Sequence, residues 1–99
     1  MENLDVENFK KGFENDPNSV IVDVRTPEEE AEGLIPNSIN INIMDANFPA
    51  KIMELDKTKT YYVYCRSGGR SGTACQFMEK QGLKAFNLTG GIQSWNQHT

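Results

Sequence analysis

Apolar side chains recur along the chain at two different spacings, and each spacing predicts a different kind of element. Val6, Phe9 and Phe13 follow one another at helical intervals with charged residues between them, so residues 5–15 are expected to form an amphipathic helix. Residues 19–24 (SVIVDV) are a short run rich in β-branched side chains, which is typical of a strand buried inside a parallel sheet.

A helix start signal follows this first strand. Thr26 is suited to the N-cap, Pro27 to the first helical position, and Glu29 to closing a capping box with Thr26. This helix is expected to be brief and to end by Gly33. The remaining expected elements, in chain order, are a strand over residues 39–43, a helix over 48–55, a strand over 61–64, a helix over 71–81, a strand over 85–88 and a short helix beginning at 92–95.

Strands and helices alternate over the whole chain, with no internal repeat and no low-complexity tract. This alternation is typical of an α/β fold in which helices cover both faces of a mainly parallel sheet. The 99 residues suffice for one such core and leave nothing for a second, so residues 1–99 are expected to form a single domain.

The charge and composition argue against nucleic-acid binding and against association with a membrane. The formal net charge is −4, and lysines and arginines are spread singly apart from Lys10 and Lys11, so the chain lacks the basic stripe that nucleic acid requires. No apolar run approaches the roughly 18 residues that span a bilayer. Residues 1–5 lack a secretory pattern, which favours the cytoplasm. We therefore expect no nucleic-acid partner and no membrane partner.

The cysteines and the histidine restrict the possible chemistry further. Cys65 and Cys75 fit neither a disulfide framework nor the spacing of metal ligands. The one histidine, His98, stands next to the C-terminus and is a poor candidate for activating a nucleophile. We expect no metal and no organic cofactor, and a reactive cysteine here would have to be activated without histidine.

Cys65 stands where a reactive cysteine is expected. It follows the strand over residues 61–64 and precedes a helix, and ligands bind at the carboxyl ends of strands in open parallel sheets. The glycines of the loop allow it to curl, which turns backbone N–H groups toward the sulfur. The loop consists of Cys65 followed by Arg66, Ser67, Gly68, Gly69, Arg70 and Ser71.

Several features of this loop favour thiolate over thiol. The helix that follows presents its positive N-terminal end, and Arg66 and Arg70 add formal positive charge. We therefore predict that the pKa of Cys65 lies below its usual value, which makes the residue a nucleophile. The opposing interpretation is an inert cysteine at the end of a strand.

Four segments in order resemble the rhodanese-like domain family. Residues 65–70 (CRSGGR) resemble the active-site loop of these domains, and residues 23–29 (DVRTPEE) resemble the first family signature. Residues 33–41 resemble the second signature, and residues 88–92 (LTGGI) together with Trp95 resemble the last. The resemblance covers essentially the whole chain, and four motifs in the correct order are far more specific than one loop.

The resemblance implies one α/β domain with a central, mainly parallel five-stranded sheet, and it implies double displacement at sulfur. Cys65 would take the outer sulfur of a donor such as thiosulfate as a persulfide and pass it to cyanide or a thiol. Loop N–H groups would stabilise the charged persulfide. By analogy, Arg66 would lie at the pocket mouth and attract an anionic donor, and Arg70 would hold the loop by pairing with Asp23.

Two positions depart from the family pattern. The second signature usually has histidine after its glycine, and here that residue is Leu34. It usually has glycine after the proline, and here that residue is Asn37, the next most suitable residue for a left-handed turn. Leu34 changes the expected rim of the site, and neither departure affects the nucleophile.

A cysteine-dependent phosphatase is a second interpretation of this architecture. Such enzymes place five residues between cysteine and arginine, whereas four stand between Cys65 and Arg70. A smaller cradle suits a sulfur atom better than a phosphoryl group. A phosphatase also needs a general acid, for which Asp23 and Asp45 stay open. A non-catalytic interaction module, or a sulfur carrier that serves a protein partner in a relay, is a third interpretation.

The remaining candidate residues have a structural and a functional interpretation each. Cys75 is either a resolving thiol or a small buried hydrophobic residue, and the latter is favoured. Asp23 is expected to support the site by accepting hydrogen bonds rather than to act as a base. Arg25 either binds substrate or pairs with the glutamates that follow it, which are expected to form a solvated helix face.

Overall fold

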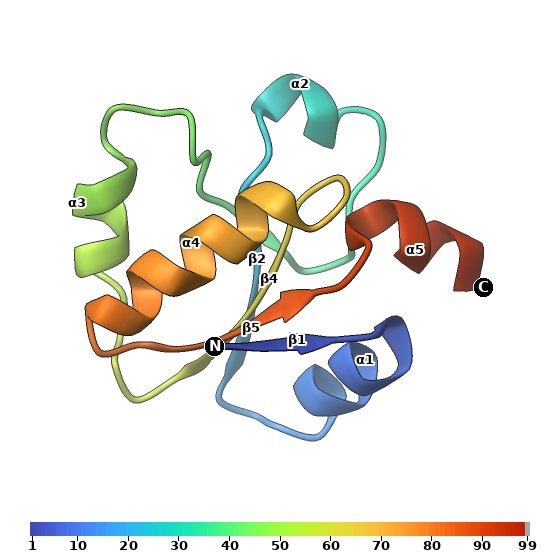
Figure 1. Cartoon of the computed structure of the whole chain (residues 1–99), viewed down its shortest axis with the longest axis horizontal. Helices are drawn as coiled ribbons and strands as arrows, with labels where there is room; N and C mark the ends of the chain where they lie inside the picture. The colour runs from blue at the N-terminus through green and yellow to red at the C-terminus, as the bar shows by residue number, and fades with distance from the viewer. Residues whose placement is uncertain (99) are drawn as a thin grey trace.

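The computed structural model describes residues 1–98 as five parallel strands with helices on both faces (Figure 1). The strands lie in the order β1-β5-β4-β2-β3, and every neighbouring pair is parallel. The predicted fold class is therefore confirmed. The elements are β1 (Glu2–Leu4), α1 (Val6–Glu14), β2 (Ser19–Asp23), α2 (Pro27–Glu30), β3 (Ile39–Asn40), α3 (Phe48–Met53), β4 (Thr60–Tyr64), α4 (Gly69–Lys80), β5 (Lys84–Leu88) and α5 (Gly91–His98).

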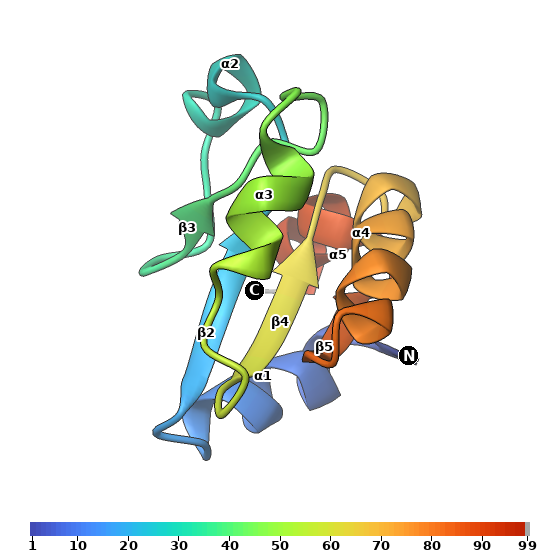
Figure 2. The same ribbon diagram turned by 90° about the vertical axis from the view of Figure 1, so that its left-hand side faces the viewer.

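The sheet divides the core into two halves, and the side chains of its central strand β4 alternate between them. Tyr61 and Val63 face the cluster that holds α3 and α4, whereas Tyr62 and Tyr64 face the cluster that holds α1 and α5. The alternation of a strand predicts this division, and Figure 2 shows the sheet between the two helical layers. Apolar burial on both faces is what holds a parallel sheet together.

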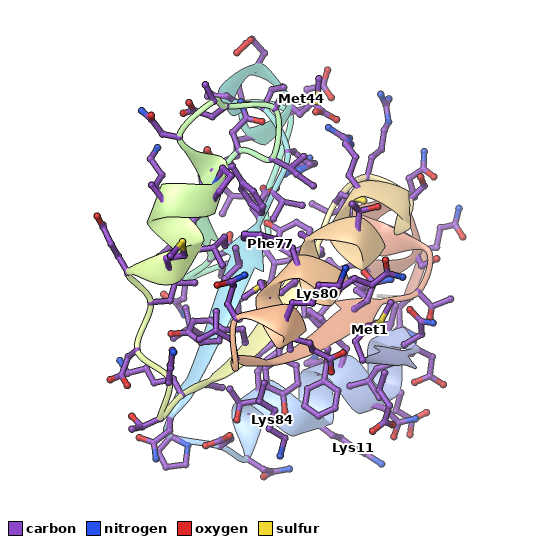
Figure 3. The ribbon with its side chains drawn as sticks, turned by 60° about the vertical axis from the view of Figure 1, so that its left-hand side comes forward. Met1, Lys11, Met44, Phe77, Lys80 and Lys84 are labelled. Carbon is purple, nitrogen blue, oxygen red and sulfur yellow. The ribbon has the colours of Figure 1, made fainter. Side chains whose placement is uncertain are left out.

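The face toward α3 and α4 shows how side chains join the two helices. The rings of Phe48 in α3 and Phe77 in α4 lie 6.2 Å apart, and Phe77 projects between these helices (Figure 3). By contrast, Met44, on the loop before α3, points into solvent and is 72% exposed. Within α3, Phe48 and Ile52 are buried and Met53 is 62% exposed, so this helix is packed by one face only.

The structure differs from the predicted elements mainly at the edges of the sheet. The edge strand β1 has the short sequence Glu-Asn-Leu, in which two of the three residues are polar, so it gives no strand signal. It forms because Leu4 and its neighbours pair with β5. The strand expected over residues 39–43 is limited to Ile39 and Asn40, with Ile39 on the surface. Local alternation cannot distinguish an edge segment from a full strand.

The residues that begin helices predicted the structure better than the alternation at the edge strands did. Thr26 caps α2, its hydroxyl accepts a hydrogen bond from the Glu29 N–H, and the Glu29 side chain accepts one from the Thr26 N–H, which confirms the predicted capping box. Helix α4 begins at Gly69, two residues before the expected start, because Gly68 adopts φ +107° and serves as the N-cap. The helix therefore begins inside the cysteine loop, which we define as residues 65–71.

Three loops meet at the carboxyl edge of the sheet. The chain leaves β2 toward α2, β4 toward α4 and β5 toward α5, and Figure 1 shows these connections at one end of the strands. Because all strands are parallel, any residue that directly follows a strand lies at this edge. None of the helices within residues 1–98 is long and apolar enough to cross a membrane.

The packing of α1 on the sheet leads to a stability prediction. A methyl group at Gly12 would lie 2.5 Å from the Tyr62 hydroxyl oxygen, and Tyr62 is packed against Phe9 and Phe86. We expect Gly12→Ala to lower the free energy of unfolding by about 1–3 kcal/mol through overpacking. In α4, Gly69→Ala is the control because nothing lies within 4 Å of the added methyl. Urea denaturation measures both, and equal stability of the two variants would contradict this packing.

Candidate active site

Cys65 occupies the edge of the sheet directly after β4. Its side chain is almost fully buried, with 1% exposed, because the cysteine loop curls around it and α4 begins beneath it. The Gly68 N–H donates to the Cys65 Sγ at 3.1 Å, and the Ser71 hydroxyl donates to the same sulfur at 3.3 Å. The loop therefore encloses a sulfur atom with hydrogen-bond donors.

These donors decide the protonation of the thiol. Burial is the largest single influence and opposes ionisation, but hydrogen bonds from the Ser71 hydroxyl and from three backbone N–H groups outweigh it together, so the pKa of Cys65 is lowered. The backbone donors belong to Ser71, Gly68 and Ser67. The direction agrees with the sequence prediction, but the leading cause is different, because neutral donors of the loop contribute most and the electrostatic attraction between Arg70 and Cys65 is a smaller influence.

Helix α5 fixes the orientation of the cysteine loop by donating hydrogen bonds to its backbone carbonyls. The Ile92 N–H donates to the Cys65 carbonyl at 2.9 Å, and the Gln93 N–H donates to the Arg66 carbonyl at 3.2 Å. A planar trans peptide points its carbonyl and the following N–H in opposite directions. With the Arg66 carbonyl bound to α5, the Ser67 N–H necessarily points the other way, toward the sulfur.

Arg70 does not pair with Asp23 as expected. Its guanidinium makes two parallel hydrogen bonds to the carboxylate of Glu29, at 2.7 and 2.8 Å. This bidentate contact lowers the pKa of Glu29 to about 2. Glu29, expected on a solvated helix face, instead joins α2 to the cysteine loop. The expectation failed because a capping residue on a short helix can point its carboxylate back over the site.

Asp23 pairs with Arg25 instead, in a contact that is buried. Arg25 donates through Nε and Nη2 to both carboxylate oxygens of Asp23, and it also donates to the Gly33 carbonyl at 2.7 Å. The Tyr64 hydroxyl donates to Asp23 at 3.0 Å and accepts from the Ile35 N–H at 3.1 Å. These bonds fix the segment after β2, and they pair Arg25 with the Asp23 carboxylate rather than with a carboxylate of the glutamates that follow it. Arg25 also lines a hollow at this end of the sheet, and its expected role in substrate binding stays a prediction.

Arg66 is the cation of the loop that has no partner within residues 1–98. Its side chain is exposed and lines a hollow of about 150 Å³, together with Glu32 and Gly33 after α2 and Gln93 of α5. Arg25 and Glu29 also line this hollow, but both are already engaged in ion pairs. The expected role of Arg66 in attracting an anionic donor stays a prediction.

The second cysteine lies apart from this chemistry. Cys75 is fully buried in the cluster of α3 and α4, and burial raises the pKa of its thiol to about 12. A thiol in that state is neither a ready nucleophile nor a resolving group. The interpretation as a small buried hydrophobic residue fits this position.

The two departures from the family pattern lie on the segment between α2 and β3. Asn37 adopts φ +69°, the left-handed conformation for which asparagine is the next choice after glycine. Leu34 is 45% exposed, so its side chain adds an apolar group to the surface. Neither residue contributes a donor to the Cys65 sulfur.

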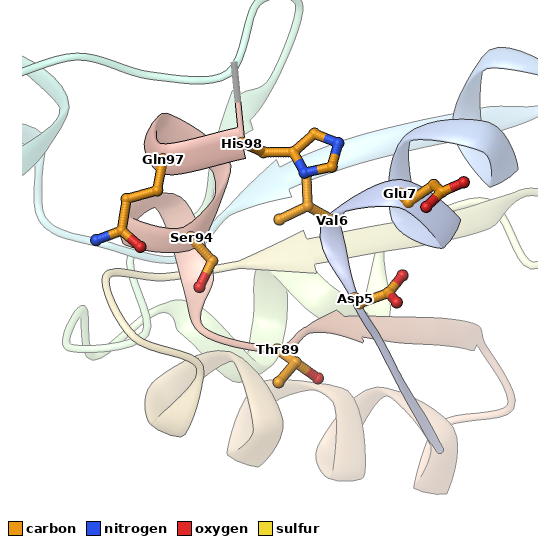
Figure 4. Close-up of a pocket in the computed structure, with 7 residues that line it drawn as sticks. All are labelled: Asp5, Val6, Glu7, Thr89, Ser94, Gln97 and His98. Atoms are coloured by element: carbon orange, nitrogen blue, oxygen red, sulfur yellow. The ribbon is translucent and has the colours of Figure 1, made fainter.

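A separate hollow of about 400 Å³ lies between α1 and α5, and no residue of the cysteine loop lines it (Figure 4). Asp5 at its edge is already used, since it caps α1 by accepting from the Asn8 N–H. The lining residues are Asp5, Val6, Glu7, Thr89, Ser94, Gln97 and His98. Within residues 1–98 no group of three or more acidic, histidine or cysteine side chains is placed to hold a metal ion.

Sequence reasoning missed two polar residues that contact the loop. Asn87 of β5 accepts from the Ser71 hydroxyl at 2.5 Å and donates to the Gly68 carbonyl at 3.1 Å. Its side chain is nearly fully buried. A buried polar residue inside an apolar strand is the signal that could have identified it. Glu29, named above, had no comparable signal because its partner lies 41 positions away.

Comparisons with known proteins show which domains this chain is similar to in sequence and fold. The family described as "Rhodanese-like domain" matches residues 5–98. "Putative sulfurtransferase YtwF" of Bacillus subtilis is 41% identical over 92% of this chain and 86% of its own length, and "Sulfurtransferase" of Allochromatium vinosum is 34% identical over 96% and 88%. The crystal structure of a rhodanese-related protein from Thermoplasma volcanium superposes with TM-score 0.85 at 34% identity, covering 99% and 93%.

The close approach of α5 to the cysteine loop generates a prediction about Gly91. This residue has φ +59°, and an added methyl would overlap the carbonyl groups of Cys65 and Arg66. We expect Gly91→Ala to lower the free energy of unfolding by about 2 kcal/mol or more, since a left-handed alanine alone costs about 1–2 kcal/mol. Gly82→Ala is the control, with φ +85° and only an ordinary contact of 3.9 Å between the added methyl and the Lys57 Nζ. Chemical denaturation compares them, and a smaller loss for Gly91→Ala would argue against the close contact.

The pair of Glu29 and Arg70 predicts a dependence of stability on acid. The pKa of Glu29 is about 2 in the folded chain against an ordinary 4.5, so its contribution is complete above pH 4.5 and is lost as the pH falls toward 2. Glu29→Gln should remove that part of the stability profile, whereas Glu28→Gln on the same helix should retain it. Thermal unfolding across this pH range is the measurement, and parallel profiles for the wild type and Glu29→Gln would refute the linkage.

Proposed function

Because the chain belongs to the rhodanese-like domain family, we propose that it is a sulfurtransferase that carries sulfane sulfur as a persulfide on Cys65. Relatives named sulfurtransferases support rhodanese-type sulfur transfer in general. The observation that carries the finer proposal is the set of N–H and O–H donors around one buried sulfur. Donors that favour a thiolate also favour the anionic sulfur of a persulfide.

The first step of the proposed cycle loads the cysteine. The Cys65 thiolate attacks the outer sulfur of an anionic donor such as thiosulfate, the sulfur–sulfur bond of the donor breaks, and sulfite leaves with the bonding electron pair. The new terminal sulfur carries the negative charge. The Gly68 N–H and the Ser71 hydroxyl donate to the Cys65 sulfur to which this atom is bonded, and we expect N–H groups of the loop to stabilise its charge.

The second step of the proposed cycle removes the terminal sulfur from Cys65. A thiophilic acceptor, either cyanide or a thiolate, attacks the terminal sulfur, and Cys65 departs as a thiolate. A cysteine with a lowered pKa is a better leaving group, so the same donors assist both steps. Neither step requires histidine, a metal or an organic cofactor, and the acceptor can also be a protein in a sulfur relay.

Phosphatase chemistry has less support from the geometry. The bidentate pair with Glu29 occupies the Arg70 guanidinium, which would otherwise clamp a phosphoryl group. Asp23 is bound to Arg25, and Asp45 lies on an exposed loop and contacts Lys51. Neither carboxylate is placed to protonate a leaving group at Cys65.

Intact-mass spectrometry after brief incubation with thiosulfate tests the proposal. We expect the wild type and Cys75→Ala to gain one sulfur atom that a reductant removes, and Cys65→Ala to gain none. If a persulfide donor loads Cys65 but thiosulfate does not, a protein-to-protein sulfur carrier becomes the better description. If neither donor loads it, the chain is a non-catalytic interaction module and the proposal fails.

The hollow beside Arg66 predicts how an anionic donor is attracted. Arg66→Ala should lower kcat/KM for thiosulfate by about threefold to tenfold and weaken its dependence on ionic strength, because one unpaired charge at the mouth is lost. Lys59→Ala, a charge change away from the hollow, is the control. Steady-state rates at several salt concentrations measure this, and an unchanged salt dependence would remove Arg66 from donor binding.

A further inference from the structure

One hydroxyl proton is shared between two partners beside the nucleophile. Ser71 is fully buried at the start of α4, and its Oγ lies 3.3 Å from the Cys65 sulfur and 2.5 Å from the Asn87 side-chain oxygen. A serine hydroxyl carries a single hydrogen. Ser71 can therefore donate to the sulfur or to the amide oxygen, but not fully to both.

The orientation of the Asn87 amide is fixed by its other contacts. Its nitrogen donates to the Gly68 carbonyl at 3.1 Å and to the Asn3 side-chain oxygen at 2.9 Å. A backbone carbonyl can only accept, so the nitrogen must face Gly68 and the oxygen must face Ser71. The amide oxygen cannot donate, and its contact with Ser71 therefore requires the serine hydrogen.

We propose that Asn87 is a positioning residue that controls the protonation of Cys65 by competing with the sulfur for the Ser71 hydroxyl proton. When Cys65 is a thiol, its S–H donates to Ser71 and Ser71 donates to Asn87, so every member of the chain has a partner. When the thiol loses its proton to solvent water, the Ser71 O–H bond turns toward the thiolate. The O–H bond rotates without breaking.

The thiol and thiolate states of Cys65 differ in whether the Asn87 side-chain oxygen has a hydrogen-bond donor. With the thiolate, Ser71 no longer supplies the buried amide oxygen of Asn87, and an unsatisfied buried acceptor is unfavourable. Asn87 therefore stabilises the thiol relative to the thiolate and opposes the other loop donors. The thiolate gains nucleophilicity as its basicity rises, so this opposition keeps Cys65 from becoming a weak nucleophile.

Other charged groups near the sulfur do not change in this comparison. Arg66 and Arg70 belong to the loop, Glu29 on α2 reaches it through Arg70, and Asp23 on β2 acts on Arg70 as well. Cys75 on α4 interacts with Cys65 electrostatically. Strand β5 contributes Asn87 and no charge to this side of the site. A substitution of Asn87 leaves all of these charges in place.

The proposal predicts the sign of a pKa change. Asn87→Leu keeps similar bulk but removes the competing oxygen, so the pKa of Cys65 should fall by about one unit, a tenfold larger ionisation constant or about 1.4 kcal/mol. A merely structural role predicts the opposite sign, because a loosened loop would lose donors to the thiolate. Ultraviolet absorbance of the thiolate, titrated without any sulfur donor, distinguishes the two.

Companion variants test whether the effect passes through Ser71. Ser71→Ala should raise the pKa of Cys65. In the Ser71→Ala background, adding Asn87→Leu should leave the pKa of Cys65 unchanged. Asn3→Ala should leave the pKa close to that of the wild type, since Gly68 still orients the amide. A fall of equal size in both backgrounds, or a rise with Asn87→Leu alone, would overturn the proposal.

The measurement is independent of sulfur transfer, although the catalytic meaning of Asn87 rests on the proposed function. Failure of the wild type to accept sulfur would refute that function and leave the titration result intact. Circular dichroism confirms that each variant is folded. If Asn87→Leu does not fold, Asn87→Val, which suits a strand and also lacks an acceptor, gives the same test.

Discussion

The orientation of the peptide units after Cys65 is the constraint on which the site depends. Each unit has a carbonyl on one side and an N–H on the other, so donors converge on the sulfur only if the carbonyls are bound elsewhere. The first turn of α5 binds the carbonyls of Cys65 and Arg66, and Asn87 together with the Gly72 N–H binds that of Gly68. The last strand and last helix thus shape a loop that precedes them in the chain.

Two arginine–carboxylate pairs stabilise this end of the sheet, one in the segment after β2 and one at the cysteine loop. The pair of Arg25 and Asp23 is buried beneath the segment after β2, whereas Arg70 and Glu29 join α2 to α4 at partial exposure. Both are multidentate, which fixes geometry as well as charge. Within residues 1–98, Arg66 is thus the cation of the loop without an ion-pair partner, and the charge proposed to attract a donor is separate from the charges that maintain the scaffold.

Much of this arrangement could be predicted from local sequence, and the remainder depended on distant partners. The spacing of apolar residues located α1, β2, β4 and α4, and the residues around Cys65 indicated a candidate nucleophile and the loop that holds it. Strand β1 was missed because its polar residues become a strand only through pairing with β5. The partner of Arg70 was assigned incorrectly because Asp23 and Glu29 are equally plausible along the chain, and only the fold brings Glu29 into contact.

The burial of Cys75 has a consequence for oxidative damage. A cysteine oxidised to sulfenic acid is usually rescued when a neighbouring thiolate condenses with it to a disulfide. Cys75, with a pKa near 12, stays protonated inside the core and supplies no such thiolate. Repair of an oxidised Cys65 therefore relies on reductants from the surrounding solution, and a shortage of them exposes the residue to irreversible sulfinic acid formation.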